Sequence, residues 1–229
     1  MLFSIITLFP EMFEGIFNHS IIKRAQKEKL IKIKFINLRD FGIGTHRTVD
    51  DRPYGGGTGM ILRVDVVDKA VQSAKEDDMS GKVVLLDPKG KTYNQKTAEN
   101  FSKLTHLILI CGHYEGYDER IRNFVDEEIS VGDYVLSGGE IPAMLIVDSV
   151  ARLIPDVLKK QNATSLESFS KIGSTRILEY PQYTRPGVYK GKKVPEILLS
   201  GDLKKIEEYR LDKAVAITKK RRKDLLKSG

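Results

Sequence analysis

Short apolar runs rich in β-branched residues recur through the first two thirds of the chain and alternate with segments of helical spacing. Strands are predicted, in chain order, at Leu2–Leu8, Ile31–Asn37, Val83–Leu86, Leu107–Cys111 and Ile129–Leu136. Helices are predicted between them at Glu11–Lys29, Val64–Lys75, Asn94–Leu104 and Glu119–Phe124. Alternation of this kind is typical of parallel βαβ units packed in layers. The pattern therefore predicts an α/β fold.

The segment Ile141–Ile154 is almost entirely apolar and carries a proline, Pro142, in its first turn. Proline is tolerated there because the first N–H groups of a helix have no partner within it. A helix that is apolar on every side needs neighbours on every side. We therefore expect this helix to be buried.

The composition changes after Pro155. Residues 159–173 are polar and contain few core-forming side chains, which indicates a linker. After the linker the pattern predicts a turn-rich segment at Tyr180–Gly187, an apolar run at Val194–Leu199 and helices at Leu203–Arg210 and Asp212–Leu226. The expected domains are residues 1–158 and 174–229.

The chain of 229 residues has a formal net charge of +7. From Asp202 to the C-terminus, ten Lys and Arg stand against five Asp and Glu, so this end contributes +5. Surplus Lys and Arg favour a polyanionic partner because they neutralise phosphates. An ordinary basic protein would carry the same total charge, so the charge alone leaves both interpretations open.

The cysteine content and the N-terminus indicate the compartment. Cys111 is the only cysteine, which excludes an intrachain disulfide and a paired-cysteine zinc or redox motif. The apolar start, Met1–Phe9, lacks a basic leader and ends at Pro10, too early for a membrane span. We expect a buried first strand and a cytoplasmic protein without membrane attachment.

Three segments at the ends of predicted strands combine glycine with charged or aromatic residues: Asp87–Gly90, Cys111–Arg120 and Ile129–Pro142. Ligands of α/β proteins bind at the carboxyl ends of parallel strands, so these three loops could converge on one ligand. Tight turns would have similar sequences. A further glycine-rich segment, Asp50–Met60, matches neither a P-loop nor a dinucleotide motif, and is as typical of a flexible loop as of a site.

The three loops, Tyr54–Gly57 and Tyr183–Pro186 together closely resemble the bacterial tRNA (guanine-N1)-methyltransferase family, over nearly the whole chain. The resemblance implies a SPOUT-type parallel sheet with a deep trefoil knot, followed by a small, mostly α-helical domain that binds tRNA. It implies methyl transfer from S-adenosylmethionine to N1 of the guanosine on the 3′ side of the anticodon. It also implies a homodimer in which the two subunits share each active site.

Residue by residue, the resemblance implies a cofactor pocket in the domain 1–158. Its residues are Leu85, Leu86, Asp87, Pro88, Gly112, Tyr114, Glu115, Ser130, Val131, Gly132, Asp133, Tyr134, Val135, Leu136, Gly138, Gly139 and Pro142. Magnesium assists methyl transfer in this family. The sequence contains no recognisable magnesium-ligand pattern, so no metal residue is assigned.

The proton on guanine N1 must leave during methylation, and charge then develops on N1 and O6. The resemblance implies that Glu167, in the linker, is the base, although the family usually has aspartate at this position. It implies that Arg152 lies near O6, whereas the pattern alone would also fit a helical ion pair with Asp148. Glu115 is the alternative acid or base.

Two other functions fit the same scaffold. Because Glu167 stands where the family usually has aspartate, a non-catalytic RNA-binding protein on the same scaffold is left open. A SPOUT methylase of ribosomal RNA is the nearer alternative, but Tyr183–Pro186 and the C-terminal domain favour the tRNA enzymes.

Overall fold

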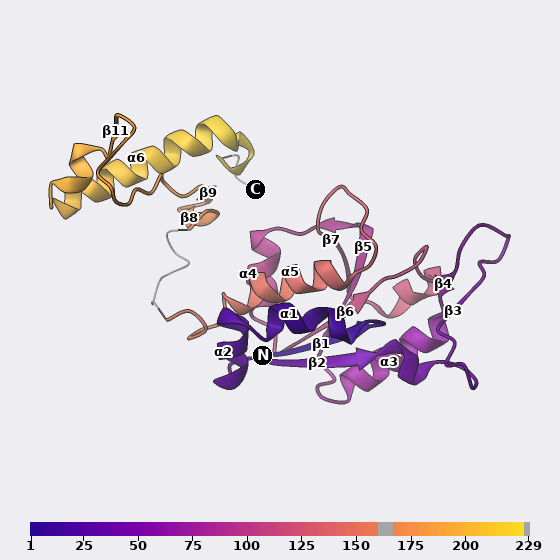
Figure 1. Cartoon of the computed structure of the whole chain (residues 1–229). Coiled ribbons are helices and arrows are strands. Elements are labelled where there is room, and N and C mark those ends of the chain that lie inside the picture. The colour runs from indigo at the N-terminus through magenta and orange to yellow at the C-terminus, as the bar shows by residue number, and fades with distance from the viewer. Residues whose placement is uncertain (160–166, 227–229) are drawn as a thin grey trace. The chain divides into compact units, whose positions relative to one another are not determined.

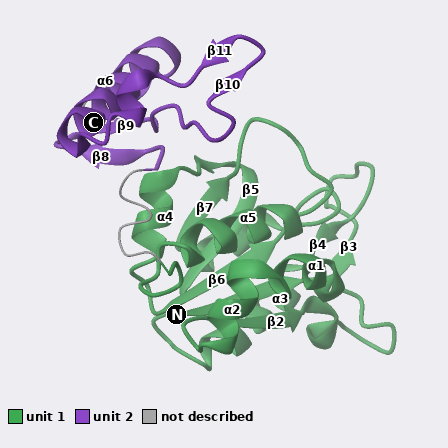
Figure 2. Ribbon diagram, turned by 60° about the vertical axis from the view of Figure 1, so that its left-hand side comes forward, with its two compact units in different colours: residues 1–159 green, residues 160–229 purple. Residues whose placement is uncertain are grey.

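The computed structural model describes residues 1–159 and 167–226. The chain divides into two compact units, Met1–Lys159 and Lys160–Gly229 (Figure 2). Part of the expected linker, residues 160–166, lies outside the described residues. Of its described remainder, Ser170–Ile172 forms β8, which pairs with β9 (Thr175–Ile177) in an antiparallel hairpin.

A five-stranded sheet forms the centre of the first unit, in the order β2-β1-β6-β5-β7 (Figure 1). Its strands are β1 (Leu2–Thr7), β2 (Lys32–Asn37), β5 (Lys82–Thr92), β6 (His106–Cys111) and β7 (Glu127–Ser130). Every neighbouring pair is parallel. The predicted α/β fold with a parallel sheet is confirmed.

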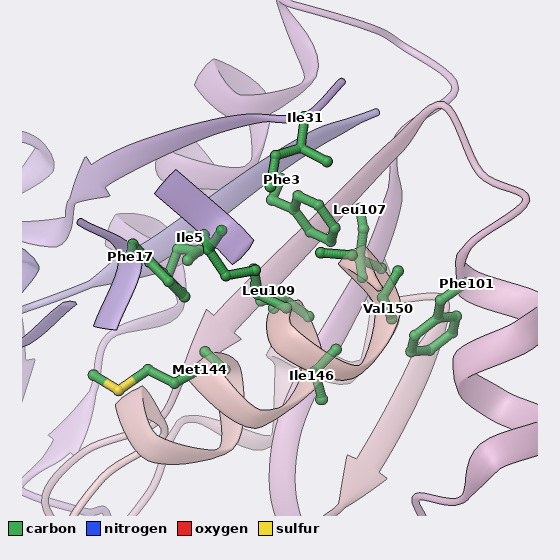
Figure 3. Close-up of a cluster of buried hydrophobic side chains, with 14 of the residues drawn as sticks. Phe3, Ile5, Phe17, Ile31, Phe101, Leu107, Leu109, Met144, Ile146 and Val150 are labelled. Carbon is green, nitrogen blue, oxygen red and sulfur yellow. The ribbon is translucent and has the colours of Figure 1, made fainter. Parts of the chain in front are cut away.

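The central strand β6 is buried along its whole length and contributes to a core on each face of the sheet. Leu107 and Leu109 belong to the first core, whereas Ile108 and Ile110 belong to the second. This division follows from the strand geometry, because successive side chains point to opposite faces. Figure 3 shows the first core, where side chains of α5 meet those of β1 and β6.

Helices cover both cores. The first core is covered by α2 (Ser20–Lys27), α4 (Gln95–Phe101) and α5 (Glu140–Ala151), and the second by α3 (Val64–Lys75). Shorter elements of this unit are the 3-10 helices η1 (Pro10–Phe13), η2 (Leu38–Phe41) and η3 (Glu119–Phe124), the helix α1 (Glu14–Phe17), and the hairpin of β3 (Asp50–Asp51) and β4 (Ile61–Leu62). The helix predicted at Val64–Lys75 has the bounds of α3.

The prediction of one helix over Glu11–Lys29 was wrong. His19 is extended (φ −131°, ψ 162°) and Ser20 has a positive φ of 50°, so the helical hydrogen bonds stop between α1 and α2. Phe17 packs on Phe35 of β2, with ring centroids 6.3 Å apart. Tertiary packing therefore outweighs the local helical preference.

The strand predicted at Ile129–Leu136 ends at Ser130. Gly132, with φ 153°, turns the chain out of the sheet, and the Ser130 hydroxyl donates a hydrogen bond to the Gly132 carbonyl at 3.0 Å. The strand predicted at Val83–Leu86 continues instead to Thr92, with a register shift between Leu86 and Lys91. The loop expected at Asp87–Gly90 is this irregular part of β5.

The apolar helix α5, which we expect to be buried, is not covered on all sides within a single chain. Ile141 is 55% exposed and Leu145 is 42% exposed, although Ile146 and Val150 are fully buried. One face of α5 therefore packs on the sheet, and another face, with two large apolar side chains, lies at the surface.

One long helix, α6 (Leu203–Arg221), replaces the two helices predicted in the second unit, and a 3-10 helix, η6 (Lys223–Leu226), follows it. Nothing at Leu211 breaks the helix, so the two predicted segments join. Thr218 ties α6 to the rest of the unit, because its hydroxyl accepts a hydrogen bond from the Leu178 N–H at 2.8 Å. The remaining elements are β10 (Val188–Tyr189), β11 (Lys192–Lys193) and η5 (Glu196–Leu199).

We predict that Leu109→Ala lowers the free energy of unfolding by about 2–5 kcal/mol, the range for a buried leucine truncated to alanine. Leu109 is fully buried on the central strand. Met79→Ala is the control, because Met79 is 75% exposed, and it should change stability by less than about 0.5 kcal/mol. Urea unfolding measures both. Equal effects would contradict the assignment of β6 to the core.

Candidate functional site

A cavity of about 320 Å³ lies beside the irregular middle part of β5 and at the carboxyl ends of β6 and β7. Most of the residues expected in the cofactor pocket line it, namely Leu86, Asp87, Pro88, Gly112, Tyr114, Glu115, Ser130, Val131, Gly132, Tyr134, Val135, Leu136, Gly138, Gly139 and Pro142. Leu85 and Asp133 do not line it. Leu85 points to the opposite face of the strand into the second core, and Asp133 is exposed. Three loops distant in sequence therefore share one cavity.

Gly139, at the start of α5, makes the closest backbone contact in this cavity wall. Its N–H donates a hydrogen bond to the Gly112 carbonyl at 2.8 Å. A Cβ atom on Gly139 would lie 2.6 Å from the Cα of Cys111 and 2.8 Å from the Gly112 nitrogen. Backbone atoms cannot move aside as a flexible side chain can, so only glycine fits here. This contact joins the loop after β7 to the loop after β6.

The backbone around Glu115 is held by hydrogen bonds from the end of the glycine-rich segment Asp50–Met60 and the residues that follow it. From the sequence, this segment could have been either a flexible loop or a site. The Glu115 N–H donates to the Met60 carbonyl at 3.1 Å, and the Leu62 N–H donates to the Gly116 carbonyl at 2.9 Å. A Cβ atom on Gly59 would lie 2.4 Å from the Glu115 Cγ. The end of the glycine-rich segment therefore packs directly beneath a residue of the cavity.

The cavity has further lining residues beyond the expected pocket set: Lys89, His113, Gly116, Tyr117, Glu119, Ile129 and Ser137, which fall in the three candidate segments, and Arg122, which lies outside them. Tyr117 is the clearest case. Its hydroxyl donates to the Leu86 carbonyl at 2.6 Å, which links the loop after β6 to β5. Burial, together with the neighbouring Asp87 carboxylate, raises the pKa of Tyr117, so it remains a hydrogen-bond donor at neutral pH.

Arg122 joins three carboxylates from three parts of the chain. Its guanidinium lies 3.2 Å from the Asp87 carboxylate and 2.8 Å from that of Glu119, and it also pairs with Glu128 on β7. Asp87 is only 6% exposed, so its charge is largely removed from water. An unpaired charge there would be costly, and Arg122 compensates it while connecting η3 to β5 and β7. In the sequence, Arg122 is only one of three charged residues in the predicted 119–124 helix.

Glu140 and Cys111 lie beside this cavity and are buried. The Thr7 hydroxyl donates to a Glu140 carboxylate oxygen at 2.8 Å, which ties the first turn of α5 to β1. Burial raises the pKa of the Cys111 thiol well above its usual value, and the Glu140 carboxylate raises it further. Cys111 therefore stays protonated and unreactive at neutral pH.

The three predicted catalytic residues are not brought together within the first unit. Glu115 lines the cavity, whereas Arg152 follows the last turn of α5, ten residues beyond Pro142. Ten helical residues correspond to about 15 Å, so Arg152 stands at the opposite end of the helix from the cavity. Glu167 belongs to the second unit.

In residues 1–159 and 167–226, no group of three or more His, Cys, Asp or Glu side chains is arranged to hold a metal ion. Within the same ranges, no helix combines the length and hydropathy needed to cross a membrane.

The fold and the cavity define a class. A parallel α/β sheet whose ligand cavity lies at the carboxyl ends of its strands is a binding scaffold for a small-molecule ligand. The sequence comparisons identify the family. Residues 1–228 match the sequence model of the family described as tRNA (Guanine-1)-methyltransferase TrmD.

Relatives named tRNA (guanine-N(1)-)-methyltransferase cover almost the whole chain. The protein from Dictyoglomus turgidum is 54% identical over 222 residues, which are 97% of this chain and 88% of the relative. The proteins from Carboxydothermus hydrogenoformans and Bacillus pumilus are each 50% identical, over 99% and 97% of this chain and 88% and 91% of their own lengths. The chain therefore belongs to the tRNA (guanine-1)-methyltransferase family and is an enzyme of that class.

We predict that Arg122→Gln lowers the free energy of unfolding by about 2–4 kcal/mol, because it leaves the buried Asp87 carboxylate without its guanidinium partner. The Arg122 side chain is 22% exposed, so the loss should fall below that of a fully buried pair. Arg120→Gln, two residues away, removes a pair whose arginine is 65% exposed, and should cost less than about 1 kcal/mol. Denaturant unfolding of both variants compares them, and a smaller loss for Arg122→Gln would be the contrary result.

A second prediction concerns the thiol. Cys111 should not react with Ellman's reagent in the native protein at pH 8, because burial keeps its pKa high. One equivalent of thiol should appear once the protein is unfolded in guanidinium chloride. Rapid reaction of the native protein would show that the end of β6 is open to solvent.

Proposed function

We propose that this enzyme transfers the methyl group of S-adenosylmethionine to N1 of the guanosine on the 3′ side of the anticodon in tRNA. The observation that carries the proposal is the convergence of three loops on one cavity in a chain of this family. Such an enzyme works in the cytoplasm, where tRNA is found, and the single cysteine is compatible with that compartment.

The cavity fits S-adenosylmethionine in size, shape and charge. Its volume of about 320 Å³ falls at the lower end of the range of small-ligand sites. Gly112 and Gly139 leave no space for a side chain, so bare backbone lines the cavity at these two positions. Asp87, Glu115 and Glu119 outnumber Lys89 and Arg122 among the lining residues, which favours a ligand with a net positive charge.

When bound, S-adenosylmethionine supplies an electrophilic methyl group on a sulfonium. The protein then has to orient this group and exclude water, since alignment of the reacting atoms accounts for much of the rate enhancement in such reactions. The fixed loops around Gly112 and Gly139 serve this purpose.

We also propose the deep trefoil knot of the SPOUT class. Its support is the order of the strands, in which β5 lies between β6 and β7. To bring Gly139 against Gly112, the loop after β7 has to cross the end of β5 and reach the end of β6. On the other side, Gly90 packs on the backbone of Glu128 and Ile129, where a Cβ would lie 2.5 Å away. Crossing loops packed this closely are what a knotted chain requires.

The working form is proposed to be a homodimer. Ile141 and Leu145 of α5 are 55% and 42% exposed, and Met12 and Ile16 of the neighbouring η1 and α1 are 46% and 48% exposed. Each pair is four residues apart, so its members fall on one side of a helical turn. A second copy of this chain would cover these side chains. Such an apolar patch is a typical subunit interface.

A shared active site follows from the position of the catalytic residues. Glu167 is the proposed base that accepts the N1 proton, and Arg152 is proposed to stabilise charge on guanine O6. Arg152 is about 15 Å along α5 from the cavity of its own chain, so it would serve the cavity of the partner. Glu115, which lines the cavity, is the alternative base.

Residues 174–229, which belong to the second unit, are proposed to form the tRNA-binding domain. Lys219, Lys220 and Arg221 lie in the last turn of α6. These residues and the excess of basic residues from Asp202 onward suit the phosphates of an anticodon stem.

The test of the function is direct. Purified protein, labelled S-adenosylmethionine and a tRNA transcript with guanosine beside the anticodon should yield N1-methylguanosine on nucleoside analysis. A transcript with adenosine at that position is the control and should give none. Magnesium is expected to assist, so EDTA should slow the reaction. Cofactor and tRNA binding without methylated product would favour a non-catalytic RNA-binding protein.

We predict that Glu167→Gln lowers single-turnover methyl transfer by roughly 10² to 10⁴, the contribution of a positioned base. Affinity for S-adenosylmethionine and tRNA should change little. Glu167→Asp, which introduces the usual residue of the family, should retain activity if the linker tolerates the shorter reach. An undiminished chemical step in Glu167→Gln would place the base elsewhere and make Glu115 the residue to mutate next.

Dimerisation gives another prediction. Light scattering at micromolar concentration should give twice the chain mass of 25.9 kDa. Leu145→Glu should shift the protein to monomers and abolish activity, because a charge would be buried in the interface. Leu203→Glu, at a side chain 76% exposed in the second unit, is the control and should remain dimeric. A monomeric wild-type enzyme that is fully active would rule out the shared site.

A further inference from the structure

The second unit contains a cavity of its own, also of about 320 Å³. The turn-rich segment Tyr180–Gly187 forms one wall, and α6 contributes Arg210. Half-buried apolar side chains, Val194 and Leu198, also line it. All of its lining residues belong to the second unit, so the cavity does not depend on how the two units are arranged.

Aromatic rings and guanidinium groups occur together in this cavity. The Arg210 guanidinium lies over the ring of Tyr180, 4.9 Å from its centroid. Tyr183 is 48% exposed, so about half of its surface is available to a ligand. Arg185, two residues further on, is exposed and also lines the cavity.

The charge of this cavity differs from that of the first. Among the described residues that line it, two are arginines and none is aspartate or glutamate. In the first cavity three carboxylates outnumber two basic side chains, which suits a cationic ligand. The second cavity therefore favours an anion, and its tyrosines and apolar side chains favour one with a flat, apolar part.

An unstacked nucleotide combines an anionic phosphate with a flat base. Sequence-tolerant recognition of single-stranded RNA uses aromatic side chains on which bases stack and arginines that meet the phosphates. Arginine also stacks on aromatic rings and binds phosphate with two parallel hydrogen bonds. A bare phosphate would need the arginines but not the tyrosines or the apolar side chains.

We propose that the cavity formed by Tyr180, Tyr183, Arg185 and Arg210 binds one unstacked nucleotide of the RNA substrate, separate from the guanosine that is methylated. The base stacks on Tyr183, and its phosphate pairs with Arg185. Arg210 holds the Tyr180 ring in place from α6. This inference rests on the proposed tRNA substrate and adds a second point at which the enzyme holds it.

The test measures tRNA affinity by fluorescence anisotropy with the full-length dimer. Tyr183→Ala should weaken binding by roughly 5- to 150-fold, the range for loss of one base-stacking contact. Tyr183→Phe keeps the ring and should bind nearly as tightly as the wild type. Tyr189→Ala is the matched control, because Tyr189 is 62% exposed on β10 and does not line the cavity.

Arg185→Gln tests the phosphate contact at an exposed position. It should weaken binding and reduce the slope of log affinity against log salt by about 1, the effect of one lost phosphate contact. Affinity for S-adenosylmethionine should not change in any of these variants, because its cavity belongs to the other unit.

The outcomes separate this inference from the proposed function. Wild-type protein that forms no N1-methylguanosine would overturn the function itself. If the wild type forms it, but Tyr183→Ala and Arg185→Gln bind tRNA as the wild type does, the function stands and the second cavity is not an RNA subsite. An unchanged salt slope in Arg185→Gln, together with a loss in Tyr183→Phe as large as that in Tyr183→Ala, would mean that neither a phosphate contact nor base stacking holds the RNA here, and would also overturn the inference.

Discussion

The contact of Gly139 with Cys111 and Gly112 is the constraint on which the rest of the first unit depends. A hydrogen bond of 2.8 Å joins the two glycine backbones, and there is no room for a Cβ atom at Gly139. The contact fixes where α5 begins, so it also sets the position of Glu140, which accepts a hydrogen bond from Thr7 on β1. The start of α5 is therefore tied to two strands of the sheet. The cavity wall between the loops after β6 and β7 is rigid for the same reason.

Electrostatic contacts hold the remaining wall. Arg122 connects Asp87, Glu119 and Glu128, and the Tyr117 hydroxyl connects its own loop to β5. Loops usually move more than the elements they join, but these loops are held by backbone packing on one side and a partly buried ion-pair network on the other. A cofactor that needs mainly orientation is suited to such a site, because the geometry exists before binding.

The sequence predicts the sheet and the position of the site better than it predicts the turns. Long β-branched runs mark strands that are buried on both faces, as in β6, and the amphipathic pattern of Val64–Lys75 marks α3. The failures occur where one residue takes a conformation that periodicity does not encode. Ser20 breaks a predicted helix with a positive φ, and Gly132 ends a predicted strand. The absence of any such interruption at Leu211 joins two predicted helices into α6.

For the candidate site too, the sequence predicts the position better than the individual side-chain contacts. The three segments were found because each follows a predicted strand, although Asp87–Gly90 proved to be an irregular part of β5, and most of the expected pocket residues line one cavity. Leu85 does not line it, since a side chain next to Leu86 in a strand must point to the other face. Arg122 was missed because Asp87, one of its partners, is 35 positions away in the sequence. Neither strand register nor a long-range ion pair can be read from local pattern.

The binding of S-adenosylmethionine to Gly139→Ala, measured by calorimetry, tests the central claim most directly. Overpacking against backbone atoms costs about 1–3 kcal/mol, so affinity should fall by roughly 5- to 150-fold even where the variant still unfolds cooperatively. Gly15→Ala is the control, because a Cβ atom on Gly15 meets nothing within 4 Å, and it should bind as the wild type does. Wild-type affinity in Gly139→Ala would contradict the claim that this backbone contact shapes the proposed cofactor site.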